Sequence, residues 1–153
     1  MSDAPSKPSW LSNLSPIARS GIAVISGLIA GGLVVALVEG VNVFLFPPPA
    51  GMDFGNPEAL GAYTASLPIT AFAVVAAAWI LGALAGGAVA GWLGGTRADV
   101  DGGIVGLLLA AASVANLMNP GLTHPVWMWA AALSTVPAAW YAARWVSGRR
   151  TAD

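Results

Sequence analysis

The sequence contains no cysteine, a single histidine and few charged residues, and each shortage excludes a class of protein. Without cysteine the chain has no disulfide, no thiolate nucleophile, no iron–sulfur cluster and no cysteine zinc site. Charged residues make up 8% of the 153 residues, whereas a soluble domain carries about 25%, so there are too few charges to cover a soluble globule. The formal net charge of −1 argues against nucleic acid as a partner.

Long uncharged stretches, separated by short polar segments, are typical of a membrane protein. About 20 helical residues cross the hydrocarbon core, and the predicted spans are about 17–46, 67–93, 102–118 and 125–146. The third span is at the lower limit of length. The sequence therefore predicts an all-α integral membrane protein, with four transmembrane helices in a compact bundle over residues 17–146. Residues 1–16 are predicted to be a flexible cytoplasmic tail, and residues 147–153 a second cytoplasmic tail.

The basic residues predict the orientation of these four spans. Lys7 and Arg19 precede the first span, Arg97 lies between the second and third, and the remaining arginines, Arg144, Arg149 and Arg150, end the fourth. All six therefore fall on one side of a four-span topology, which the positive-inside rule makes cytoplasmic. Both termini are predicted to be cytoplasmic, and a bacterial cytoplasmic (inner) membrane is the favoured location.

Small residues recur at intervals of four along the predicted spans, which lets neighbouring helix backbones approach closely. The glycines expected to serve helix packing are Gly27, Gly31, Gly32, Gly82, Gly86, Gly87, Gly91 and Gly106. Two interpretations remain open. The rows can join helices within one chain, or they can join one chain to another copy or to a different membrane protein.

Glu39 is the one ionisable residue well inside a predicted span, and it shares a helix face with Gly32. A costly intramembrane carboxyl group is expected to face other helices rather than lipid. Asn42, almost one turn further on, is a candidate neighbour for a polar or ion site. Glu39 could bind a proton or cation, or it could be a polar strut that holds helices in register.

The segment between the first two spans carries further polar residues. Asn56 followed by Pro57 and Glu58 is typical of a helix start, which predicts a short helix on the outer surface over about 57–65. Asp53 and Glu58 lie there, and His124 precedes the fourth span on the same predicted face. Together with Glu39 they could form an outer-face cluster that binds a divalent cation, although no two of them have the spacing of a metal motif.

No nucleophile elbow, phosphate-binding glycine loop or paired metal-binding histidines are present. The sequence thus favours a non-enzymatic structural or accessory membrane component without a cofactor, which associates with itself or another membrane protein through glycine-rich helix faces. The alternative is a small oligomeric transporter, or a proton- or cation-coupled protein, that uses Glu39. The lipid bilayer is the expected surrounding in either case.

Overall fold

The computed structural model describes residues 13–149, which form five α-helices and, within that range, no strand. In chain order these are α1 (Pro16–Leu45), α2 (Pro57–Ser66), α3 (Ile69–Leu93), α4 (Ala98–Leu117) and α5 (Met128–Arg149). Helices therefore reach into both predicted tails, since α1 begins at Pro16 and α5 continues through Arg149. The remainder of those tails, residues 1–12 and 150–153, lies outside the described residues.

Local sequence chemistry explains where the first two helices begin. The Ser15 hydroxyl accepts a hydrogen bond from the Ala18 amide, and Pro16 occupies the first helical position of α1. The Asn56 side chain accepts hydrogen bonds from the amides of Glu58 and Ala59 at the start of α2. The short helix predicted over about 57–65 is therefore present, one residue longer than expected.

Three helices of the described chain are long and apolar enough to cross a membrane, namely α1, α3 and α4. Helix α4 starts at Ala98, four residues before the predicted third span, and includes Asp99 and Asp101. Both carboxyl groups lie at the positive end of the helix dipole, where an acid is stabilising. The fourth predicted span forms α5, which begins at Met128 rather than at 125 and is not among the three apolar helices.

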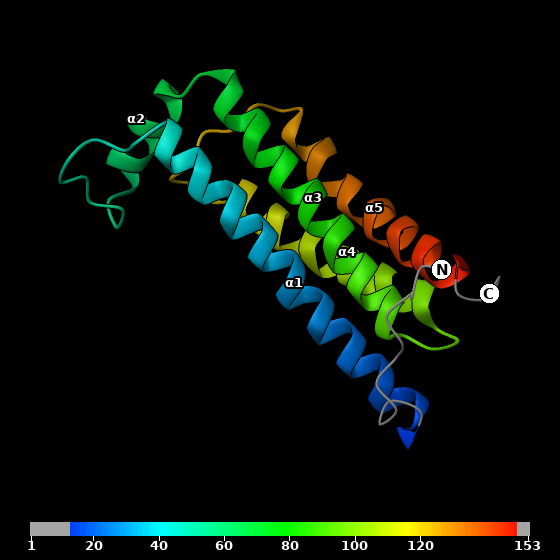
Figure 1. Ribbon diagram of the computed structural model, residues 1–153. Coiled ribbons are helices and arrows are strands. Elements are labelled where there is room, and N and C mark those ends of the chain that lie inside the picture. The colour runs from blue at the N-terminus through cyan, green and yellow to red at the C-terminus, as the bar shows by residue number, and fades with distance from the viewer. Residues whose placement is uncertain (1–12, 150–153) are drawn as a thin grey trace.

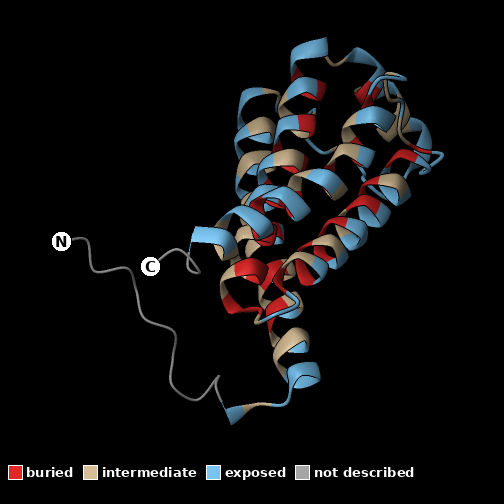
Figure 2. Cartoon of the chain, turned by 90° about the vertical axis from the view of Figure 1, so that its right-hand side faces the viewer, coloured by how far each residue is buried: buried red, intermediate tan, exposed pale blue. Residues whose placement is uncertain are grey.

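The long helices lie side by side, and α2 lies at one end of them, opposite the start of α1 and the end of α5 (Figure 1). Helix α1 packs mainly on α3, whereas α5 packs along both α3 and α4. Buried residues line the faces that the helices turn toward one another (Figure 2). Helix α1 is the least covered of the three apolar helices, with only Ala23, Gly27 and Gly31 buried.

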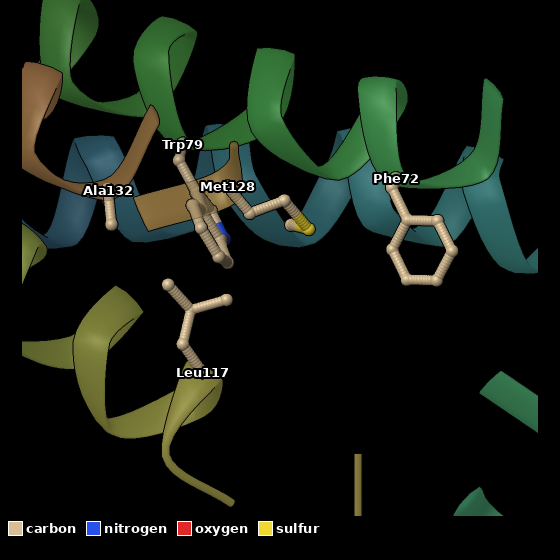
Figure 3. Packing of buried hydrophobic residues seen from close by; sticks show 5 residues of the cluster. All are labelled: Phe72, Trp79, Leu117, Met128 and Ala132. Atoms are coloured by element: carbon tan, nitrogen blue, oxygen red, sulfur yellow. The ribbon is translucent and has the colours of Figure 1, made fainter. Parts of the chain in front are cut away.

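The largest buried side chains gather near the end that carries α2. Phe72 and Trp79 of α3, Leu117 of α4, and Met128 and Ala132 of α5 form this cluster (Figure 3). Elsewhere the core consists largely of alanine and glycine, so the helices are held by close backbone approach. Glu39, Asn42 and His124 line a cavity at this same end.

Candidate functional site

A cavity lies between α1 and α4, with Glu39 in its wall. Its volume is about 310 Å³, within the range of small-ligand sites. Helix α3 contributes only Trp79 to this cavity, which we call the Glu39 cavity. The lining residues are Gly32, Val35, Ala36, Glu39, Trp79, Leu109, Ala112, Ser113 and Asn116. Four of these lie on one stripe of α1, and the stripe brings Glu39 to the gap between the helices.

Glu39 is partly buried, and its carboxyl group is hydrogen-bonded by the Trp79 side chain, whose only polar atom is the indole N–H donor. Trp79 points from α3 toward Leu117 of α4, within the apolar cluster (Figure 3). Packing thus fixes the indole, and the indole orients the carboxyl group. Ser113 and Asn116 add a hydroxyl and an amide from α4. The cavity therefore offers one acid and neutral polar groups in an otherwise apolar wall.

A second cavity, of about 200 Å³, adjoins the first toward α2 and shares Glu39 and Asn116 with it. Asn42 and His124 line it, beside the apolar side chains of Phe72 and Met128. Helix α2 adds Tyr63 and Thr64 to the wall. The two cavities therefore lie next to each other along the part of α1 that is nearest to α2.

Hydrogen bonds hold α2 over this end of the molecule. The Tyr63 hydroxyl donates to the Phe46 carbonyl oxygen at 2.6 Å, and the Thr123 amide donates to the Thr64 hydroxyl at 3.1 Å. These bonds join α2 to the end of α1 and to the segment before α5. Tyr63 and Thr64 also line the second cavity, so the same hydrogen bonds hold α2 in place as part of the cavity wall.

Two buried polar atoms in the second cavity lack a hydrogen-bond partner, namely Oδ1 of Asn42 and Nδ1 of His124. A buried polar atom in a native protein is normally paired, so these two atoms mark room for a bound group or water. His124 lies outside the helices, and burial lowers the pKa of its imidazole from the usual 6.5. The neutral ring makes an edge contact with Phe72.

Glu39 has no nearby positive partner in the described chain. The arginines of residues 13–149 are Arg19, Arg97, Arg144 and Arg149, and they lie at the ends of helices opposite α2. Arg19 is 20 residues from Glu39 on the same helix, or about 30 Å. An isolated carboxyl group in a low-dielectric wall is costly unless it is protonated or neutralised by a ligand. The site is therefore suited to a proton or to a cation.

The predicted outer-face cluster is divided in the structure. Glu39 and His124 line the same cavity, whereas Asp53 and Glu58 are exposed. The Asp53 carboxylate accepts a hydrogen bond from the Gly55 amide at 2.8 Å and thereby stabilises a turn. Glu58 lies in the first turn of α2. Within residues 13–149, no group of three or more histidine, aspartate or glutamate residues is arranged to hold a metal ion.

The glycine rows lie mostly between helices of this one chain. A Cβ on Gly27 or Gly31 of α1 would lie 2.7–2.8 Å from carbonyl oxygens of α3, at Gly86 and Gly82 respectively. On the other side of α3, Gly87 and Gly91 face the α5 backbone at Ala139 and Ala143. Gly106 of α4 faces Thr135 and Val136 of α5. Gly32 differs, because a Cβ there would meet no atom within 4 Å.

Sequence reasoning missed three residues of the Glu39 cavity. Trp79 is a mid-span tryptophan that fits no interface pattern, and Asn116 near a helix end suggests ordinary capping. Ser113 gives no signal of its own. These residues line the cavity only because α3 and α4 pack against α1, and no local sequence pattern predicts that packing. No protein family, curated protein or solved structure matches the chain.

Proposed function

We propose that this chain is a non-enzymatic assembly component of a membrane, in which a further transmembrane helix packs on α1 and covers the Glu39 cavity. The observation that carries the proposal is a free row of small residues on α1. Gly32, Ala36 and Gly40 are all exposed, and a Cβ on either glycine would meet nothing within 4 Å. Their spacing of four puts them on one side of the helix, where a second backbone can approach closely.

The row borders the Glu39 cavity directly. Gly32 and Ala36 line the cavity together with Glu39, so a helix seated on the row would also close the cavity laterally. A buried Glu39 must be protonated or neutralised, and a hydrogen-bonding or cationic side chain on the arriving helix would stabilise it further. The proposed partner is therefore another copy or a different membrane protein, with a polar side chain opposite Glu39. Most other glycine rows already contact a neighbouring helix of the same chain, so the exposed row on α1 is the preferred position for a further helix.

The proposal includes α5 as a fourth span, with both termini in the cytoplasm of a bacterial cell. Its support is packing and charge. Helix α5 lies along α3 and α4 through backbone contacts at Gly87, Gly91 and Gly106, so it shares their depth in the bilayer. With four spans, Arg19, Arg97 and the arginines of α5 all meet the same membrane face, as the positive-inside rule requires.

Leucine substitutions on the row provide the test. Gly32→Leu and Gly40→Leu should weaken association about tenfold or more, because a leucine side chain keeps the approaching backbone away. The fold should be unaffected, since open space surrounds both positions. Ala77→Leu on the exposed face of α3 is the matched control and should associate normally. Native mass spectrometry after gentle extraction, with cross-linking in membranes, measures the complexes.

The proposal fails if both leucine variants assemble as the wild type does, or if Ala77→Leu is the variant that loses its partner. The second result would move the interface to α3. A wild-type chain that is monomeric and partner-free in native membranes at all levels of expression would also refute it.

A second candidate function, proton or cation coupling, is favoured by the isolation of Glu39 from every arginine of the described chain. Glu39→Gln preserves the shape of the side chain but cannot ionise. In this reading it abolishes a pH-dependent or cation-dependent flux in proteoliposomes while the complex still assembles. An unchanged flux and an unchanged pH response in Glu39→Gln would exclude coupling through this residue.

A further inference from the structure

A second site lies at the opposite end of the molecule, where α1 starts and the turn between α3 and α4 lies. Arg19 is in the second turn of α1, and Arg97 is the residue that precedes α4. The Arg19 Nε donates a hydrogen bond to the Leu93 carbonyl oxygen at 2.8 Å. This bond caps the end of α3 and holds the Arg19 guanidinium against Gly95.

The two arginines line a cavity of about 200 Å³, which we call the arginine cavity. Ser20 and Thr96 add hydroxyl groups to its wall, beside Leu14, Pro16 and Gly95. The Nη2 of Arg19 is buried and has no hydrogen-bond partner. The cavity therefore presents two guanidinium groups, one of them with an unused donor, which is the chemistry that binds a phosphate group.

Two acidic residues lie near this cavity. Asp101 is only 1% exposed, is hydrogen-bonded by Ser20, and is within electrostatic reach of both arginines. Asp99, in the same first turn of α4, repels Asp101. The two acids balance the formal charge of the two arginines, so the attraction for an anion depends on the guanidinium groups that line the cavity, including the unpartnered Nη2 of Arg19.

An apolar groove of about 400 Å³ adjoins the arginine cavity and shares Ser20 and Arg97 with it. It runs between α1 and α4, and its walls are Ile17, Gly21, Val24 and Ile25 on α1 and Val100 and Ile104 on α4. From residue 17 to 25 a helix rises about 12 Å. Deeper in the membrane the groove ends where Gly27 of α1 meets the Val105 side chain of α4.

We propose that this end of the protein binds an anionic phospholipid, with its phosphate between Arg19 and Arg97 and one acyl chain in the α1–α4 groove. The charged cavity lies at the level of the loops and suits a lipid headgroup. The apolar groove next to it points into the bilayer and suits an acyl chain. A free phosphate ion would leave the groove empty. A peptide helix is too wide and too long for a groove that closes after about 12 Å.

Lipid binding to the full-length protein tests the proposal. The delipidated chain in detergent is titrated with phosphatidylglycerol and, separately, with phosphatidylcholine of the same acyl chains, and native mass spectrometry measures bound lipid. Phosphatidylglycerol should bind more tightly. Arg97→Gln should weaken its binding about fivefold, the effect of one cation near a membrane surface. Arg149→Gln is the control, because Arg149 stacks on Trp145 at the end of α5 and is outside the cavity.

A groove variant distinguishes the lipid from a small anion. A Cβ on Gly21 meets nothing within 4 Å, so Gly21→Trp should fold normally while its indole fills the groove. It should reduce phosphatidylglycerol binding at least as strongly as Arg97→Gln. Equal binding of the two lipids by the wild type would overturn the proposal. So would inorganic phosphate that competes fully with phosphatidylglycerol while Gly21→Trp binds the lipid as the wild type does.

Discussion

The contact between α3 and α5 leaves no room for a side chain at Gly87. A Cβ built on Gly87 would overlap the Ala139 carbonyl oxygen and would lie 2.6 Å from its Cα and 2.7 Å from its carbonyl carbon. All three atoms belong to the α5 backbone, which cannot rotate away as a flexible side chain would. Gly87→Ala therefore requires α3 and α5 to move apart.

The magnitude follows from this overlap. Ordinary contacts of a Cβ begin near 3.4 Å, so the two helices must separate by close to 1 Å. Overpacking of this kind costs about 1–3 kcal/mol, because contacts along the whole interface weaken with the separation. Gly40→Ala is the matched control, because a Cβ there meets open space. Both variants replace a glycine inside a helix, so both gain the same helix propensity of about 1 kcal/mol. They should therefore differ by the overpacking cost alone, about 1–3 kcal/mol in free energy of unfolding.

Equilibrium unfolding in mixed micelles, with the SDS fraction as denaturant and circular dichroism as readout, measures this difference. Gly91→Ala, which faces Ala143 in the same interface, should give a similar loss. The Gly87→Ala/Gly91→Ala double variant should lose less than the sum, because one separation of the helices relieves both overlaps. If Gly87→Ala unfolds at the same SDS fraction as Gly40→Ala, the close approach of α3 and α5 is wrong.

The remaining predictions concern pH and topology. Burial lowers the folded-state pKa of His124 from 6.5, so below about pH 6.5 the unfolded chain takes up a proton more readily than the folded chain. Stability should therefore fall as the pH drops through that value and level off below the folded-state pKa, and His124→Gln should remove this part of the loss in unfolding titrations. Because the chain has no cysteine, single cysteines can report topology. If the chain has four spans, Thr96→Cys and Ser147→Cys should react with an impermeant maleimide from one side of the membrane, and Thr123→Cys from the other side. If Ser147→Cys and Thr123→Cys are instead labelled from the same side, α5 does not span the membrane.

Much of the helical structure follows from short-range chemistry. Three consecutive prolines from Pro47 make continuation of α1 impossible, and Asn56 with Pro57 starts α2, so both features are readable from a few adjacent residues. The start of α4 at Ala98, four residues before the predicted span, also has a local reason. Asp99 and Asp101 resemble loop residues in a hydropathy pattern, yet the first turn of a helix accommodates acids and Asp101 is buried beside Ser20.

Three features can be read directly from the order of residues. Long apolar helices carry glycines at intervals of four, Glu39 shares a stripe with Gly32, and basic residues lie near the ends of the apolar stretches. Each of these is a property of a single helix and its spacing. The helix that each glycine row contacts depends on packing, since Gly27 and Gly87 have similar surroundings in sequence but face different helices. Trp79 and Asn116 reach Glu39 from positions 40 and 77 residues further along the chain. Periodicity specifies a face of a helix, and only packing specifies what that face touches.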